Sequence, residues 1–503
     1  MAQVVAPAVK TAEQTTSYIK FPYSGAEERL KNYNYFEKLF LGDHFQAFNV
    51  RIDDAQYTKN YQKLRYVMVN FAGLMSKVVA DMLFSEPIII KAGEKGDQEF
   101  IDALVHENNL NTQFYESALS NSYLGDALLK IRMGKRNASD KKPTVIIEEN
   151  TPKVYFPILD ESNVRAEPKK HEFAWKMTLN GKEYVRKEIH EIGKIYNELW
   201  TLKDDGTIGD KVDIKVVLGI DPEEDTKVDR SLVIHIPNWK TSGRYFGISD
   251  YYDLDSLFYA INNRLTKIDN VLDKHTDPIL AVPEGVLDED GKVKRQALNM
   301  IEISPEAGKE KPEYIVWNAN LEAAFKEIDH LVDMFYMVSE ISPDVLGMGK
   351  GGAVESGRAL KLKILRTIAK AARKKLYYDR AIKEAVYVAQ LVAKAWNLEV
   401  NGLKLKGEPV IPDIEWNDGL PIDDAEAIDD EVKRIDAGLS STKDSLMRLD
   451  GLDEKAAEAK AKEISDEKKI NMPTMNLGDN PFADKTKENA ENTNNDKGKP
   501  PAK

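Results

Sequence analysis

The residues with the clearest chemical potential lie in a glycine-rich segment, PDVLGMGKGGAVESG, at 343–357. Glycine admits many backbone conformations at little steric cost, so the segment is predicted to be a movable loop. The glycines are Gly347, Gly349, Gly351, Gly352 and Gly357. Lys350 is the only charged residue between Asp344 and Glu355. A mobile loop that carries a single cation is suited to brief contact with a passing polyanion.

A nucleotide site is a second interpretation of this loop, and the residue order argues against it. A P-loop follows a strand and reads Gly-x-x-x-x-Gly-Lys-Ser/Thr. Here Lys350 is followed by Gly351, and a helical pattern precedes the loop. We therefore expect no nucleotide or other cofactor.

Other catalytic arrangements are also missing from the sequence. Acidic runs at 221–225, 423–424 and 429–430 could supply metal ligands, but they lack EF-hand spacing. The seven histidines form no His-Glu-x-x-His motif, and there is no Gly-x-Ser-x-Gly elbow. The absence of cysteine excludes disulfides and thiolate zinc sites. We predict no catalytic residue and no metal site, and so no enzyme.

A long basic helix is predicted directly after the loop. No Gly or Pro occurs from Arg358 to Asn397, which allows a helix of about 60 Å at ~1.5 Å per residue. Its first half has basic residues and no acid, in a chain of net charge −13: Arg358, Lys361, Lys363, Arg366, Lys370, Arg373, Lys374 and Lys375.

Two interpretations of this basic stretch remain open. Arg358, Lys361, Lys363 and Arg366 are candidates for contact with DNA or with an adjoining subunit. Alternatively, the cations pair with acidic neighbours while an apolar stripe packs inward. The stripe would consist of Ile364, Leu365, Ile368, Ala372 and Leu376.

Composition limits the class of protein. A chain of 503 residues is expected to form two or more domains. No apolar run reaches transmembrane length, and the N-terminal sequence lacks the features of a signal peptide, so we expect no membrane association. A pI near 5.3 argues against a surface that binds nucleic acid everywhere.

Periodicity predicts a helical region, then a sheet. Apolar residues at helical spacing predict a helix that ends at Pro87, and shorter helices follow at 97–107 and 111–123. From Ala127 to Leu218 the period is two, as in TVIIEE, KVYFPI, EFAWKMTL and EYVRKEIHE, which predicts an antiparallel sheet. Asn180-Gly181 is a type I′ hairpin signal, and Gly193 is suited to a second reversal.

Two further helices are expected to bracket a small insertion. The first runs from Ser249 to about Lys274, with Ser249 or Asp250 as its cap, and the second from about Asn320 to Ser339. Acids outnumber bases on the first: Asp250, Asp253, Asp255, Asp269 and Asp273 against Arg264, Lys267 and Lys274. Two interpretations of this face remain open. It lines a channel and repels DNA phosphates, or it is an ordinary solvated helix face.

The C-terminal part is predicted to be a strand, PVIPDIEW, followed by acidic helices near 423–437, 441–449 and 453–467. Beyond residue 469 the composition predicts disorder.

Several local segments, in this order, resemble tailed-bacteriophage portal proteins. They are ADMLFSEP at 80–87, IPNW and GRYFGISDYYDLDSLFYAINNRLTKIDN within 236–270, DPILAVPEG at 277–285, SPDVLGMGKGGAVESGRALKLK at 342–363 and EWNDGLPID at 415–423.

The resemblance implies an α+β portal fold with a helix-rich wing, which carries an antiparallel sheet, and a helical crown. The expected parts are a disordered arm (1–24), the N-terminal part of the wing (25–246), a stem helix (247–277), a small α/β clip (278–318), a second stem helix (319–342), a tunnel loop (343–357), a wing spine helix (358–408), the crown (409–468) and a disordered tail (469–503).

The resemblance also implies a homododecameric ring at a capsid vertex, through which double-stranded DNA is packaged and ejected. The clip, with Lys292, Lys294 and Arg295 on its surface, would dock the terminase large subunit and later adaptor or head-completion proteins. The major capsid and scaffold proteins are further expected partners, in the virion and in the host cytoplasm during assembly. A metal-dependent nucleic-acid-processing enzyme and another ring-forming virion adaptor are the alternatives.

Overall fold

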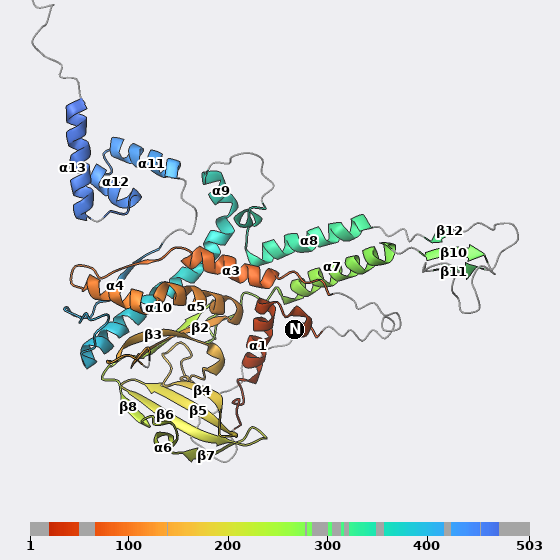
Figure 1. The fold of residues 1–503 in the computed structure, drawn as a ribbon, viewed down its shortest axis with the longest axis horizontal. Coiled ribbons are helices and arrows are strands. Elements are labelled where there is room, and N and C mark those ends of the chain that lie inside the picture. The colour runs from red at the N-terminus through yellow and green to blue at the C-terminus, as the bar shows by residue number, and fades with distance from the viewer. Residues whose placement is uncertain are drawn as a thin grey trace, which may run out of the picture. The chain divides into compact units, whose positions relative to one another are not determined.

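The computed structural model divides the chain into two units, Met1–Leu420 and Pro421–Lys503 (Figure 1). It describes residues 20–49, 66–137, 139–276, 279–283, 300–303, 313–315, 321–348, 357–416, 424–452 and 454–471. The first unit is mixed α and β with mainly antiparallel strand pairs, in agreement with the expected α+β class.

The first unit begins with helices. They are α1 (Glu27–Leu41), α2 (His44–Ala47), α3 (Phe71–Phe84), α4 (Gln98–Glu107) and α5 (Leu110–Leu124). Asn70 starts α3 by accepting the Gly73 N–H at 2.8 Å, and Met75, Val78, Val79 and Met82 form its buried face. Helices α4 and α5 confirm the predicted helices at 97–107 and 111–123.

A three-stranded antiparallel sheet of order β3-β2-β9 lies at the centre of the first unit. Its strands are β2 (Asp126–Gly134), β3 (Thr144–Asn150) and β9 (Val233–Pro237), and helices α5 and α10 pack on it. A short pair, β1 (Ile89–Lys91) with β13 (Asp413–Glu415), ties a late segment of the chain to the same unit.

A second sheet of order β4-β5-β6-β7 contains the predicted hairpins. It comprises β4 (His171–Leu179), β5 (Lys182–Glu191), β6 (Lys194–Leu202) and β7 (Ile208–Val212), with β8 (Glu223–Asp225) beside β6 and α6 (Ile214–Leu218) nearby. Asn180 and Gly181 both have positive φ, 50° and 75°, as a type I′ turn requires, and Gly193 reverses the chain at φ 87°.

Two predictions near this sheet are wrong. The segment KVYFPI forms a 3-10 turn, η2 (Pro152–Val154), and isolated bridges, because Pro152 and Pro157 cannot donate to a strand ladder. Residues 20–24, expected to belong to a disordered arm, are ordered. Phe21 donates its N–H to Gly206 O at 2.8 Å and packs against Phe156.

Two long helices, α7 (Asp255–Thr276) and α8 (Leu321–Ser339), lie side by side in Figure 1 and are joined by an ion pair of 2.8 Å between Arg264 and Glu327. Between them in sequence, β10 (Ile279–Pro283) pairs in parallel with β11 (Met300–Ile303) and antiparallel with β12 (Glu313–Ile315). Lys292, Lys294 and Arg295 lie outside the described residues.

The predicted unbroken helix from Arg358 to Asn397 is divided at Ile364. After η3 (Pro343–Leu346) come α9 (Gly357–Lys363) and α10 (Leu365–Trp396). Ile364 leaves helical geometry at φ −95° and ψ 9°, where its side chain is buried between the exposed Leu362 and Leu365. Its N–H still bonds to Leu360 O at 3.1 Å, so the division is a local turn.

The second unit contains α11 (Asp424–Asp436), α12 (Thr442–Leu449) and α13 (Glu454–Asn471). Ser441 and Asp444 form a capping box at the start of α12. The three helices confirm the prediction for this region. Helix α13 extends to Asn471, so residues 469–471 are helical and not part of a disordered tail. The crown range 409–468 spans the division between the units and stays a prediction.

Candidate functional site

The most distinctive polar site is buried in the first unit, where the chain approaches α7. Gly247 lies so close to Gly125 that an added Cβ would stand 2.0 Å from the Gly125 carbonyl oxygen. Gly125 itself has φ +93°. This close approach of two glycines brings Ser249 and Asp250 down onto the end of α5.

Asp250 does not cap a helix, contrary to the prediction, because α7 begins at Asp255. Its main-chain N–H donates to Ser122 O at 2.9 Å, and its carboxylate accepts from Ser122 Oγ at 2.8 Å and from Asn238 Nδ2 at 3.1 Å. Asp250 therefore does not belong to an exposed acidic face of α7.

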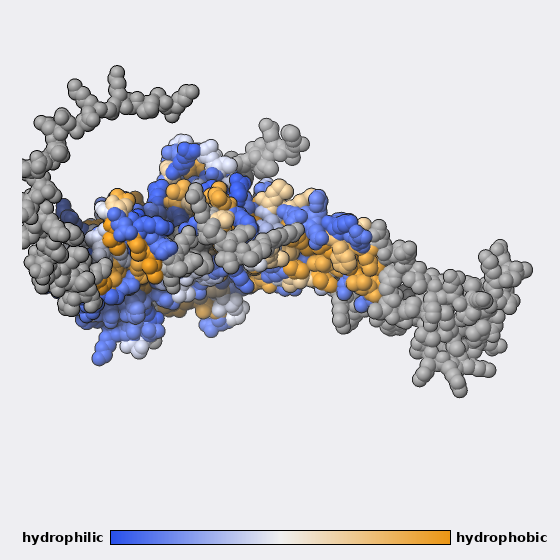
Figure 2. Space-filling model, turned by 90° about the horizontal axis from the view of Figure 1, so that it is seen from above, coloured by the Kyte–Doolittle hydropathy of each residue, from blue (hydrophilic) through white to orange (hydrophobic). Residues whose placement is uncertain are grey.

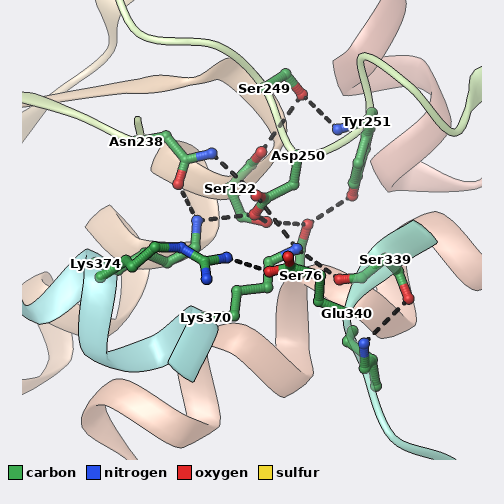
Figure 3. Close-up of polar contacts among 12 residues, drawn as sticks. Ser76, Ser122, Asn238, Ser249, Asp250, Tyr251, Ser339, Glu340, Lys370 and Lys374 are labelled. Atoms are coloured by element: carbon green, nitrogen blue, oxygen red, sulfur yellow. Dashed lines mark hydrogen bonds and ion pairs between the residues drawn. The ribbon is translucent and has the colours of Figure 1, made fainter. Parts of the chain in front are cut away.

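Two lysines of α10 complete the site (Figure 3). Lys374 Nζ lies 2.8 Å from Asp250 Oδ2 and also bonds Asn238 Oδ1. Lys370 Nζ lies 3.4 Å from Asp250 Oδ1 and donates to Ser339 O, at the end of α8, at 2.9 Å. Both lysines are buried. Lys370 and Lys374 thus connect α10 to the segment before α7 and to the end of α8.

The charges in this site shift each other's pKa. Burial alone would raise the pKa of Asp250, but Lys370 and Lys374 hold it well below its usual range. Desolvation lowers the pKa of Lys374 to about 8, although Asp250 opposes that shift. One carboxylate therefore faces two ammonium groups. The oxygen atoms of Ser339 and Asn238 that accept hydrogen bonds from the lysines partly compensate the second positive charge.

Glu340 extends the site from the end of α8. It has a left-handed backbone, φ 59°, which is costly for a residue with a Cβ. Its carboxylate pairs with Arg366 at 3.1 Å and with Arg373. Thr367 Oγ1 donates to Glu340 O at 3.1 Å and accepts the Ser342 N–H at 2.8 Å. These contacts attach the first residues of the glycine loop to α10.

We call this set the junction network. Its members are Ser122, Asn238, Asp250, Ser339, Glu340, Ser342, Arg366, Thr367, Lys370, Arg373 and Lys374. It joins the segment before α7, the end of α8 and the base of the glycine loop to α10, so it is suited to hold these elements in fixed positions relative to one another.

The predicted loop residues are only partly described. Gly347 ends η3 with φ 69°, whereas Gly349, Lys350, Gly351 and Gly352 lie outside the described residues. At the loop base, Lys363 Nζ lies 3.8 Å from Asp344.

Several cations of the basic stretch form ion pairs with acids of the same chain, which agrees with the second of the two interpretations. Lys363, Arg366, Lys370, Arg373 and Lys374 all have such partners. Lys361 is exposed, Arg366 keeps 74% of its side chain exposed, and the side chain of Arg358 is not among those described. Contact of Arg358, Lys361, Lys363 and Arg366 with DNA or an adjoining subunit stays a prediction.

The predicted apolar stripe is wrong in part: Ile364 is buried and Ile368 packs against the core, but Ala372 is exposed. Leu365 and Leu376 are 56% and 75% exposed, while Thr367, Lys370, Lys374 and Tyr378 lie on the buried face with Ile364. The helical spacing of Thr367, Lys370 and Lys374 was the available signal for this face. Because these three residues are polar, the sequence pattern predicted that they face solvent.

Three acids of the runs at 221–225 and 429–430 form ion pairs. Asp221 pairs with Lys215, Glu223 with Lys194, and Asp430 with Lys433. Among the described residues, no three His, Asp or Glu side chains are grouped as metal ligands would be. Within the same residues, no helix has the length and apolar character needed to cross a membrane.

Comparison with protein families assigns the chain to a family. A family model described as "Phage portal protein, SPP1 Gp6-like" matches residues 20–473. No curated protein matches the sequence.

Solved structures give weaker similarity. A chain from the neck of a native GTA particle computed with C12 symmetry is 12% identical, with a TM-score of 0.38 over 75% of this chain and 89% of that one. A chain from the virion of a native gene transfer agent particle is 13% identical, with a TM-score of 0.37 over 76% and 89%. A chain from the neck of an empty GTA particle computed with C6 symmetry is 12% identical, with a TM-score of 0.38 over 76% and 90%. The family model therefore carries the assignment.

Proposed function

This chain belongs to the phage portal protein family of the SPP1 Gp6-like type, and from that premise we propose that it forms a closed ring of about twelve copies at one capsid vertex. Double-stranded DNA enters the capsid through the axis of the ring and leaves by the same path. The observation that carries this proposal is the family match across residues 20–473. The protein then resides in the virion, after assembly in the host cytoplasm with major capsid and scaffold proteins.

Surface chemistry supports association with further copies. Met334, Met337 and Val338 share one face of α8 and are exposed, and Leu360, Leu362 and Leu365 are exposed around α9. Figure 2 shows hydrophobic surface over the part of the molecule that contains α7 and α8. Since a ring needs two different surfaces that meet repeatedly, we assign these apolar side chains to contacts with neighbouring copies.

We assign the parts of the portal fold as the sequence predicts them. Helices α7 and α8 are the stem, β10–β12 belong to the clip, α10 is the spine of the wing, and α11–α13 belong to the crown. The junction network then fixes the stem and the base of the tunnel loop to the spine.

Removal of the protein from particle-producing cells tests the function. Without it, particles should contain no nuclease-protected DNA, and the wild-type chain supplied in trans should restore packaging. DNA-filled particles in its absence would refute the proposal. Magnesium-dependent DNA cleavage by the purified protein would instead favour the alternative of a nucleic-acid-processing enzyme.

We expect Lys350→Glu to lower the length or the retention of packaged DNA while rings still form. Our proposal is that Lys350 of every copy contacts DNA phosphates in the channel, and that each contact is brief because charges in solvent are screened beyond roughly 10 Å at 0.1 M salt. Pulsed-field gels of DNA from purified particles measure the effect. Lys182→Glu, at an exposed hairpin position, is the control. Packaging equal to that of wild type would leave the loop as a connector only.

We expect charge reversal at Lys292, Lys294 and Arg295 to impair docking of the terminase large subunit or an adaptor protein while rings stay intact. The clip is a short insertion between two helices, so its surface can change without disturbing their packing. Co-sedimentation of purified rings with each partner measures docking. Normal docking and normal DNA packaging by the triple variant would contradict this role.

A further inference from the structure

A second site lies next to the junction network, farther along α10, and Arg373 belongs to both. A pocket of about 930 Å³ opens between β9, the segment 165–168 and α10. Pockets of 300–1,000 Å³ are typical of sites that bind a small group or a side chain. We call it the β9–α10 pocket.

Positive charge gathers at this pocket in a chain whose net charge is −13. Arg165, Lys240 and Arg380 line it from three separate segments, and none of them forms an ion pair with a described residue. The Arg165 side chain donates to the Ser242 carbonyl oxygen at 3.3 Å. The Lys240 ammonium lies 5.7 Å from the centre of the Tyr245 ring.

These cations disfavour one another. Desolvation lowers the pKa of Lys240, and Arg165 and Arg380 lower it further, whereas the buried Asp126 opposes the shift. Three acids share the pocket, namely Glu167, Asp229 and Glu384. His171 lowers the pKa of Glu167, and Arg380 lowers it further. Glu167 lies 3.4 Å from His171, and Glu384 lies 3.9 Å from Arg230. Five lysine and arginine side chains line the pocket against these three acids, so an incoming anion would reduce the repulsion that remains among the cations: Arg165, Arg230, Lys240, Arg373 and Arg380.

Exposed apolar groups accompany the cations. Leu376, on α10, is 75% exposed and Trp239 is 40% exposed, and both line the pocket with the half-buried Tyr377. Leu376, Tyr377 and Arg380 recur at helical spacing, so α10 forms a wall on which apolar and cationic groups alternate. Water contact with these side chains is unfavourable and would end if a ligand covered them.

Together these features specify a ligand with several anionic groups and an apolar anchor. The cations come from separate segments, so they match carboxylates spaced along a chain better than one compact phosphate. Duplex DNA is too broad to enter the pocket and offers no apolar side chain to cover Leu376.

We propose that the β9–α10 pocket binds an acidic peptide segment of a partner protein. A large apolar side chain of that segment sits between Trp239 and Leu376, and its carboxylates face Arg165, Lys240 and Arg380. The complementarity of charge selects an acidic partner, and the apolar anchor distinguishes it from a general polyanion. This site does not depend on ring formation.

Fluorescence anisotropy with the full-length protein tests the proposal. The probe is a short labelled peptide in which Glu alternates with Leu and Phe, and two matched peptides replace either Glu by Gln or Leu and Phe by Ser. We expect binding of the first peptide only, weakened by salt. Arg380→Ala and Leu376→Ser should each weaken it about tenfold, since each removes one charged or apolar contact.

Controls separate the outcomes. Lys182→Ala removes an exposed lysine far from the pocket in sequence and should bind the peptide as wild type does. Unchanged thermal unfolding shows that the pocket variants are folded. The proposal is overturned by no binding up to about 1 mM peptide, by equal binding of the Gln peptide, or by equal binding of the Arg380 variant. Tighter binding of a short DNA duplex, lost in the same variants, would also overturn it in favour of a phosphate site.

Discussion

Asp250→Ala is expected to destabilise the first unit by about 3–5 kcal/mol, because it leaves Lys370 and Lys374 buried without their counter-charge. Both lysines are almost fully enclosed, and the remaining hydrogen bonds to Ser339 and Asn238 are those of neutral acceptors. The thermal midpoint of unfolding should fall. Amide hydrogen exchange should rise at residues 249–251 and 339–344, which the junction network holds.

A control and a partial rescue sharpen this prediction. Asp253→Ala removes an exposed carboxylate three positions along the chain and should change stability by less than about 0.5 kcal/mol. Adding Lys374→Met to Asp250→Ala should recover part of the loss, because one unpaired buried ammonium group is gone. If Asp250→Ala unfolds like Asp253→Ala, the junction network does not hold the first unit together.

Met337→Glu is expected to prevent ring formation while leaving the subunit folded. Met337 is 72% exposed on α8, so a charged side chain is tolerated in the single chain. If Met337 lies at a contact between copies, the substitution removes apolar burial that contributes about 1.5–3 kcal/mol to association, and it also buries a carboxylate. Because the contact repeats around the ring, the loss repeats as well. Analytical ultracentrifugation measures the assembly state.

Val216→Glu is the matched control, since Val216 is an exposed apolar residue on α6. It should form rings as wild type does. Rings of normal size from Met337→Glu would show that this face of α8 is not a contact between copies.

Local sequence patterns predicted most of the regular structure. The helices at 97–107 and 111–123 and the hairpin at Asn180-Gly181 depend on short-range periodicity and turn chemistry, and the structure contains them. Segment order identified the portal family, which the family model confirms across residues 20–473. The assignment of the individual parts stays a prediction.

The junction network could not be predicted in the same way. Asp250 reads as a helix cap because it precedes a helical pattern, but contact between Gly125 and Gly247 draws it into the interior. The sequence of α10 predicts that Leu376 is buried and that Lys370 and Lys374 are exposed. The structure shows the reverse, because the partners of the two lysines come from two segments that are distant in sequence. Tertiary contacts of this kind override the local hydrophobic pattern.

The measurement that tests the central claim most directly is the assembly state of the purified full-length protein. Native mass spectrometry and cryo-electron microscopy, over a range of concentration and salt, should show closed rings of about twelve copies with an axial channel. Only monomers or dimers under every condition would contradict the account.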